Sequence, residues 1–165
     1  MNFKAIQLSF LFNPLNLLNR PRVQPRIIEN DADLFLIWEK LILQYFPEKS
    51  ELLSYKIRWS KRPQKRVLAS CNIEKRVVTV APAMQLPESY IHLESLIYHE
   101  LCHAVAGISM KNGRRDIHSK SFKSLEALHP GIKELDRWIK MGGWINAVRK
   151  STRKINKEKL LRRTF

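Results

Sequence analysis

The sequence predicts an α+β fold, in which a small three-stranded sheet packs among several helices. One helical pattern opens the predicted domain, three short runs of strand-forming residues follow it, and further helical patterns occupy most of the remaining chain. Helices and strands grouped in this way are typical of an α+β domain, whereas strictly alternating strands and helices would indicate a parallel sheet.

The first helix is expected within NDADLFLIWEKLILQYFPE, residues 30–48. Its apolar side chains recur at helical spacing, at Leu34, Ile37, Trp38, Leu41 and Tyr45. Asp31 or Asp33 is expected to cap the N-terminus of this helix, and Pro47 is expected to end it.

Three short strands are expected next, at residues 54–60, 66–72 and 76–82. The second and third runs are separated only by Ile-Glu-Lys at 73–75, a length that suits a hairpin. The predicted sheet therefore contains at least one antiparallel pair.

A long helix is expected from Pro87 to Gly107, because proline is favoured in the first turn and glycine just past the last. Residues 108–118, with Asn-Gly at their tip, are expected to form a loop. Two further helices are expected at 119–129 and 132–140, so that helices complete the fold.

The length of 165 residues fits one domain with extensions. We expect an N-terminal segment and linker at 1–30, the folded domain at 31–146 and a basic tail at 147–165. Cys71 and Cys102 are too few for a disulfide framework or a four-thiolate site, and no run of 18 apolar residues is present. These observations predict a cytoplasmic protein with no membrane partner.

Positive charge is concentrated in two segments of a chain whose formal net charge is +15. Residues 147–165 contain eight basic residues against Glu158. Residues 56–66 contain six basic residues and no acid: Lys56, Arg58, Lys61, Arg62, Lys65 and Arg66. Such segments attract acidic partners, so we expect these six side chains to contact nucleic acid, DNA included, without sequence specificity.

The pentapeptide His99-Glu100-Leu101-Cys102-His103 lies within the long predicted helix. Side chains four residues apart share one face of a helix, so His99 and His103 can reach one zinc ion. Glu100 is displaced around the helix, where it suits a general base better than a ligand. The motif therefore predicts two ligands and a catalytic carboxylate.

A catalytic zinc site needs a third protein ligand, and four residues are candidates. His92 lies about 10 Å of helical rise from His99 and is expected to be a core or surface histidine. His118 is the favoured ligand because the loop before it can fold it back over the motif. Glu126 is an alternative ligand, and His129 is expected near a helix end.

Three segments of the sequence resemble the SprT-like zinc metallopeptidases and the related YgjP-like bacterial enzymes. RVLASCNIEKRVVTVAPAM resembles their hairpin, LESLIYHELCHAVAG their active-site helix, and IHSKSFKSLEALHPGIKELDRWI the region after it. In this family HExxH is followed by a histidine that begins an H-x-x-x-F segment, here His118 to Phe122. The resemblance covers residues 33–142.

The resemblance implies a minimal zincin-type domain with one Zn²⁺ per chain. His99, His103 and His118 would hold the ion, and Glu100 would be the catalytic acid and base. The implied function is hydrolysis of peptide bonds in protein substrates laid along an edge strand. Some SprT-like proteins cleave proteins crosslinked to DNA, although this chain lacks the paired cysteines of the zinc ribbon that many members carry.

Two other functions stay open at this point. One is a basic nucleic-acid-binding protein without activity, whose structural zinc would take His129 or Cys102 as a fourth ligand. The other is a peptidase of general protein quality control that uses no DNA. For a peptidase, Tyr98, His129 and Arg137 are candidates for stabilising the charge that develops on the substrate oxygen.

Overall fold

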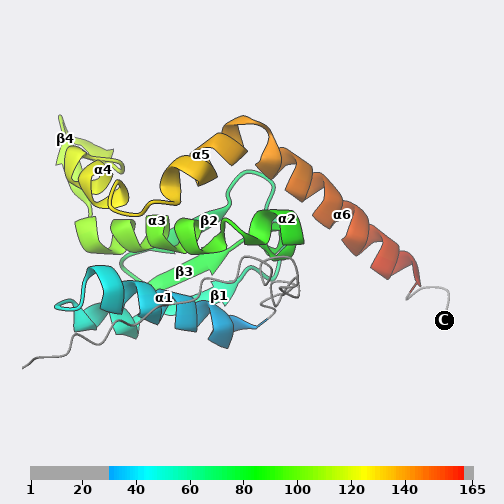
Figure 1. The fold of residues 1–165 in the computed structure, drawn as a ribbon, viewed down its shortest axis with the longest axis horizontal. Coiled ribbons are helices and arrows are strands. Elements are labelled where there is room, and N and C mark those ends of the chain that lie inside the picture. The colour runs from blue at the N-terminus through cyan, green and yellow to red at the C-terminus, as the bar shows by residue number, and fades with distance from the viewer. Residues whose placement is uncertain (1–29, 162–165) are drawn as a thin grey trace, which may run out of the picture.

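The structure is a computed structural model that describes residues 30–161, and the predicted N-terminal segment and linker lie outside the described residues apart from Asn30. Figure 1 shows a small sheet among helices, as the sequence predicts. The elements in chain order are α1 (Asp31–Tyr45), the 3₁₀ helix η2 (Ser50–Ser54), β1 (Lys56–Trp59), β2 (Ala69–Asn72), β3 (Val77–Val80), η3 (Pro82–Gln85), α2 (Pro87–Tyr90), α3 (Leu93–Ala106), β4 (Ser109–Lys111), β5 (Arg114–Asp116), α4 (Lys120–Glu126), α5 (Ile132–Lys140) and α6 (Gly143–Leu161). None of the helices within residues 30–161 is long and apolar enough to cross a membrane.

Helix α1 forms where the apolar spacing predicts it. Leu34, Trp38 and Leu41 are fully buried along one face. The N-terminal cap is Asn30, whose side chain accepts from the backbone N–H of Asp33, so the prediction of an aspartate cap is wrong. Asp31 instead accepts a hydrogen bond from the backbone N–H of Trp59, which ties the start of α1 to the end of β1.

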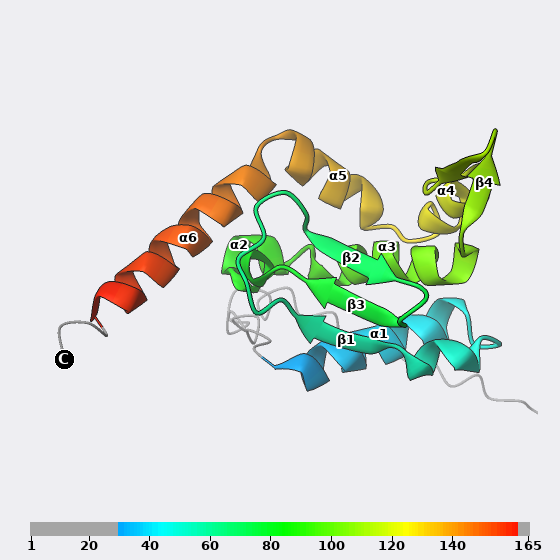
Figure 2. The ribbon, with the colours of Figure 1, turned by 180° about the vertical axis from the view of Figure 1, so that it is seen from behind.

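The main sheet has the order β1-β3-β2, with β3 in the centre. Strands β2 and β3 form the predicted antiparallel hairpin, and β1 runs parallel to β3. Helices α1 and α3 pack against the same face of this sheet, and Figure 2 shows the sheet in front of them. The side chains of Ile57, Val78 and Val80 are buried in the resulting core.

The long helix predicted from Pro87 to Gly107 is divided into α2 and α3. The break falls at Ile91 and His92, where tight turns replace the helical hydrogen bonds. Packing overrides the local helical preference there, because the buried ring of His92 lies 4.8 Å from the ring of Trp138 on α5. Gly107 ends α3 with a positive φ, as predicted.

The segment predicted as a loop at 108–118 contains a short hairpin, β4–β5. Asn112 and Gly113 both have positive φ at its tip, the backbone conformation that Asn-Gly favours in two-residue hairpin turns. Asn-Gly indicates a turn in the sequence, but strands of only three residues are too short to show a clear strand pattern, so the sequence predicts a loop here. This hairpin immediately precedes His118.

Helix α6 runs from Gly143 to Leu161, so the expected boundary at residue 147 falls inside a continuous helix. Its first half packs against α5, α2 and η3, with Trp144 and Ala147 buried. The helix then extends away from the body of the protein in both views (Figures 1 and 2). The described part of the basic tail is therefore helical.

Candidate metal centre

Helix α3 places His99 and His103 on successive turns, as their spacing predicts. Their Nε2 atoms lie 3.2 Å apart, and both rings are partly exposed. The buried ring of Phe122 on α4 packs against both, edge-on to His99 at 5.2 Å and stacked on His103 at 4.4 Å. Phe122 therefore supports the two histidines from one side.

The hairpin β4–β5 brings His118 back over this pair. The ring of His118 lies 5.0 Å from that of His103 and 5.4 Å from that of His99. One ring nitrogen from each histidine can be chosen so that all three lie within 4.8 Å of one another. Ser119 caps α4 through the backbone N–H of Phe122 and so places His118 directly before that helix.

The trio has the dimensions of a metal site. Two nitrogens bound at about 2.0–2.1 Å to a tetrahedral ion are separated by about 3.3 Å, close to the observed 3.2 Å. Burial and the neighbouring imidazoles lower the pKa of His103 to about 4, and the same two causes lower the pKa of His118. Neutral imidazoles are the form that binds a metal, so the residues present fit a metal ion.

Glu100 lies beside the three histidines and is almost fully buried. Burial raises the pKa of its carboxyl to about 8, and the nearby backbone N–H of Cys71 on β2 opposes part of that rise. A carboxyl with a pKa near neutrality exchanges a proton readily at physiological pH. This is the property that a general base requires.

The three histidines and Glu100 line one cavity of about 540 Å³. Residues 69–74, in β2 and the turn after it, form one wall of this cavity, and residues 107–109 and 115–117 of the hairpin segment form the other. Within residues 30–161, strand β2 is an edge strand whose one partner is β3. The cavity therefore lies between helix α3 and a sheet edge that is unpaired in the described part of the chain.

The other candidate ligands lie elsewhere. Glu126 does not join the trio, because its Oε1 atom contacts Nδ1 of His99 at 2.6 Å, on the opposite side of that ring from Nε2. Cys102 is fully buried, and burial raises its thiol pKa to about 12. Cys71 is half-buried with a pKa of about 12 for the same reason. Neither cysteine belongs to a metal-binding group within residues 30–161.

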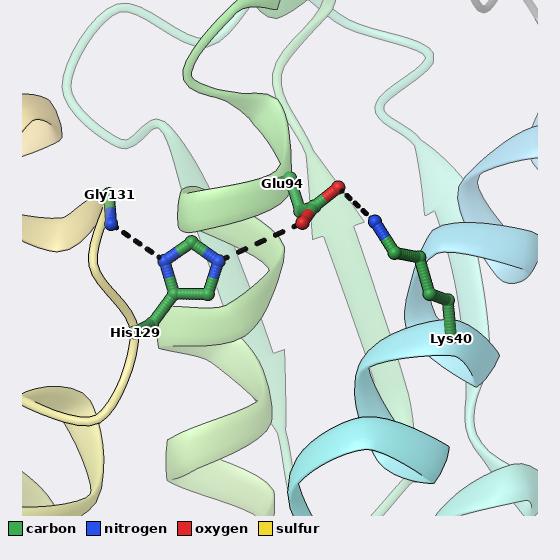
Figure 3. Close-up of polar contacts among 4 residues, drawn as sticks. All are labelled: Lys40, Glu94, His129 and Gly131. Atoms are coloured by element: carbon green, nitrogen blue, oxygen red, sulfur yellow. Dashed lines mark hydrogen bonds and ion pairs between the residues drawn. The ribbon is translucent and has the colours of Figure 1, made fainter. Parts of the chain in front are cut away.

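His129 lies between α4 and α5, where its ring contacts other parts of the fold and not the three histidines (Figure 3). Its Nδ1 accepts a hydrogen bond from the backbone N–H of Gly131, and its Nε2 lies 3.9 Å from Oε1 of Glu94. Glu94 in turn pairs with Lys40 on α1 at 2.9 Å. A side chain at Gly131 would collide with the hydroxyl of Ser95 on α3. Glycine at position 131 therefore allows the chain before α5 to lie close to α3.

The three residues considered for stabilising a substrate oxygen do not line the cavity. The hydroxyl of Tyr98 donates to the carbonyl of Leu125, and His129 makes the contacts just described. Arg137 is exposed and lies 3.6 Å from Glu134 on the same helix. None of the three is placed to act on a substrate in the cavity.

The six basic residues expected to contact nucleic acid are all exposed but do not form one cluster around the cavity. Lys56 and Arg58 lie on β1, which β3 separates from β2. Lys65 and Arg66 lie in the loop before β2, beside a shallow pocket that also contains Val67. Val67 lines the metal-site cavity as well, so the loop joins the basic residues to that cavity.

Fold and site together define an α+β protein in which two histidines of an HExxH helix and a third from the loop before α4 converge as a group that could hold a metal ion. Residues 34–131 match the sequence profile of the SprT-like family, and the chain belongs to that family. Among solved structures, it is similar to the metallopeptidase zymogen abylysin of Pyrococcus abyssi, with 22% identity over 66% of this chain and 90% of that chain and a TM-score of 0.43. No curated protein matches it in sequence.

Proposed function

We propose that this protein is a zinc-dependent metallopeptidase that hydrolyses peptide bonds in protein substrates. Membership of the SprT-like family supports a peptidase, and the observation that carries the proposal is the arrangement of Glu100 beside three convergent histidines in one cavity. Three histidine ligands leave a fourth position for water or substrate, as in catalytic zinc sites.

The residues of the site have two roles in this proposal, which are to bind the metal ion and to transfer a proton. His99, His103 and His118 would hold zinc through ring nitrogens that already converge. A zinc ion bound there would supply Lewis acidity, which lowers the pKa of water and polarises a carbonyl group. The ionised carboxylate of Glu100 takes a proton from the attacking water and delivers it to the leaving amine.

The edge of β2, which the described residues leave unpaired, supports an extended peptide as substrate. The carbonyl of Leu68 accepts from the backbone N–H of Ala81, so in an antiparallel pair the main-chain groups of Ala69 and Cys71 face away from β3. These groups face the cavity side, because the backbone N–H of Cys71 interacts with the Glu100 carboxyl and lowers its pKa. A substrate strand added there would pass in front of Glu100.

DNA-associated proteins are the substrate class that the charge distribution favours. Lys65 and Arg66 lie in the loop that contributes Val67 to the catalytic cavity. Nucleic acid bound to this loop would hold an attached protein near the histidines, which a general quality-control peptidase does not need. A structural zinc site is less well supported, because the described residues place neither His129 nor Cys102 with the trio.

Glu100→Gln tests the proposed chemistry. This change keeps the shape of the side chain but removes its ability to take a proton, so zinc binding should persist while cleavage of an unfolded protein substrate stops. Glu134→Gln is the matched control, because Glu134 is exposed on α5 and does not line the cavity. Cleavage by the Glu100→Gln variant at the wild-type rate would show that Glu100 is not the base.

A further inference from the structure

We propose that Glu126 is a positioning residue for the metal centre, whose carboxylate holds the ring of His99 with Nδ1 protonated and Nε2 free to bind the ion. This inference rests on the proposed zinc-dependent function and adds a residue to it. Glu126 is the side chain that the sequence offered as an alternative ligand, and its contacts assign it a different task.

The contact between the two side chains is short and specific. Oε1 of Glu126 lies 2.6 Å from Nδ1 of His99, and each side chain is about three-quarters buried, with exposed fractions of 22% and 25%. A carboxylate only accepts hydrogen bonds, so the proton of the pair lies on Nδ1. The lone pair of His99 is then on Nε2, the atom that faces Nε2 of His103 at 3.2 Å.

The tautomer matters because a neutral imidazole carries a single proton. With the proton on Nε2, His99 would present an N–H to the ion and no lone pair. A carboxylate on the opposite ring nitrogen prevents this, fixes the ring orientation and makes the ligand more basic. Within residues 30–161, His103 and His118 have no comparable ion pair with a carboxylate, so His99 is the ligand that depends on such a partner.

Helix α3 holds the C-terminal end of α4 on both sides of Glu126. On the N-terminal side, the hydroxyl of Tyr98 donates to the carbonyl of Leu125 at 2.7 Å. On the C-terminal side, the backbone N–H of His129 donates to the carbonyl of Glu126 at 3.3 Å, and the His129 ring lies against Glu94 of α3 (Figure 3). Glu126 is therefore held at a fixed position opposite His99.

The experiment compares zinc affinity, measured by competition with a chelator, in the wild-type chain and three variants: Glu126→Ala, Glu126→Gln and the exposed control Glu134→Ala. Loss of a carboxylate partner typically weakens metal binding by about 10- to 100-fold, which is the expectation for Glu126→Ala. Glu126→Gln keeps a neutral acceptor and should recover part of this loss. Glu134→Ala should bind zinc as the wild type does.

Two spectroscopic readouts separate positioning from other roles. The ¹⁵N spectrum of the zinc-free chain should show His99 protonated at Nδ1 in the wild type and in Glu126→Gln, but not in Glu126→Ala. The absorption of bound Co²⁺ should show the same number of ligands in all variants. A smaller number of ligands in Glu126→Ala would make Glu126 itself a ligand and overturn the inference.

The remaining outcomes are also distinct. If the wild-type chain binds zinc and Glu126→Ala binds it equally well, or leaves the His99 tautomer unchanged, the positioning role is wrong and the proposed function stands. If the wild-type chain binds no zinc, the proposed function is wrong and the inference fails with it.

Discussion

The hydroxyl of Tyr98 donates a 2.7 Å hydrogen bond to the backbone carbonyl of Leu125. The two residues are 27 positions apart, and the bond joins α3, the helix that contains His99 and His103, to the last turn of α4. Tyr98 precedes His99 and Leu125 precedes Glu126, so the same turn contains a buried anchor and the contact between Glu126 and His99. The geometry of the metal centre thus depends on how α4 packs against α3.

Replacing Tyr98 by phenylalanine should destabilise the protein through the loss of this bond. The part-buried Leu125 carbonyl would still accept from the backbone N–H of Leu128 but would lose its second donor, and the loss of one such hydrogen bond typically costs about 0.5–1.5 kcal/mol. Unfolding in urea measures the loss. Tyr90→Phe is the matched control, because the half-buried Tyr90 hydroxyl makes no hydrogen bond within the described residues. Equal stability of both variants would mean that the Tyr98 bond contributes nothing.

Zinc should stabilise the folded chain only when His118 is present. A ligand that binds the folded state stabilises it by about 2.7 kcal/mol at roughly 100-fold excess over its Kd. His118→Ala removes one of three ligands, so the rise in Tm on adding zinc should shrink or disappear. His92→Gln is the control, since His92 packs on Trp138 away from the trio, and its variant should keep the rise. A full rise in His118→Ala would exclude His118 as a ligand.

The stability of the metal-free chain should fall as the pH rises through the range in which Glu100 titrates. The Glu100 pKa is about 8 when folded and 4.5 ordinarily, so between these values the folded chain holds a proton that the unfolded chain has released. Stability is then lost as this proton leaves, by at most about 1.4 kcal/mol per pH unit.

Glu100→Gln isolates this effect because glutamine does not titrate. With chelator present, the variant should gain stability over the wild type as the pH rises from about 5 to about 8. His103, whose pKa is lowered to about 4, destabilises the fold in acid, but it does so in both proteins. A stability difference that stays constant over this range would contradict the raised pKa.

The sequence predicted the parts of the site that depend on local geometry. A single helix fixes the spacing of His99 and His103, and Gly107 marks the end of that helix. His118 required a choice among candidates, because its approach depends on the turn of the β4–β5 hairpin. The resemblance to the SprT-like family supported that choice, and the structure places His118 with the pair.

The features that the sequence did not reveal are set by tertiary packing. At the break between α2 and α3, His92 packs against Trp138, which is 46 positions later in the chain. The sequence offers Glu126 as an alternative third ligand on the helix after the motif, but the packing of α4 decides that it faces Nδ1 of His99. Hydrophobic spacing predicts where a helix lies, whereas the partner of an individual polar side chain depends on how two helices are rotated.

The loop before β2 should contribute to any affinity for nucleic acid more than α6 does, because it borders the cavity that contains the three histidines. Two variants with equal loss of charge test this, each with four basic residues changed to glutamine. The loop variant changes Lys61, Arg62, Lys65 and Arg66, and the α6 variant changes Arg149, Arg153, Lys154 and Lys157.

Each phosphate that the protein no longer neutralises should lower the slope of log affinity against log salt concentration by about 0.9 for duplex DNA. We therefore expect a lower slope in the loop variant, and a smaller change in the α6 variant, when binding to a DNA duplex is titrated at several salt concentrations. An equal fall in both would attribute binding to overall positive charge. A wild-type chain with no salt-dependent binding would favour a peptidase that acts without DNA, because the basic residues of the loop would then neutralise no phosphates.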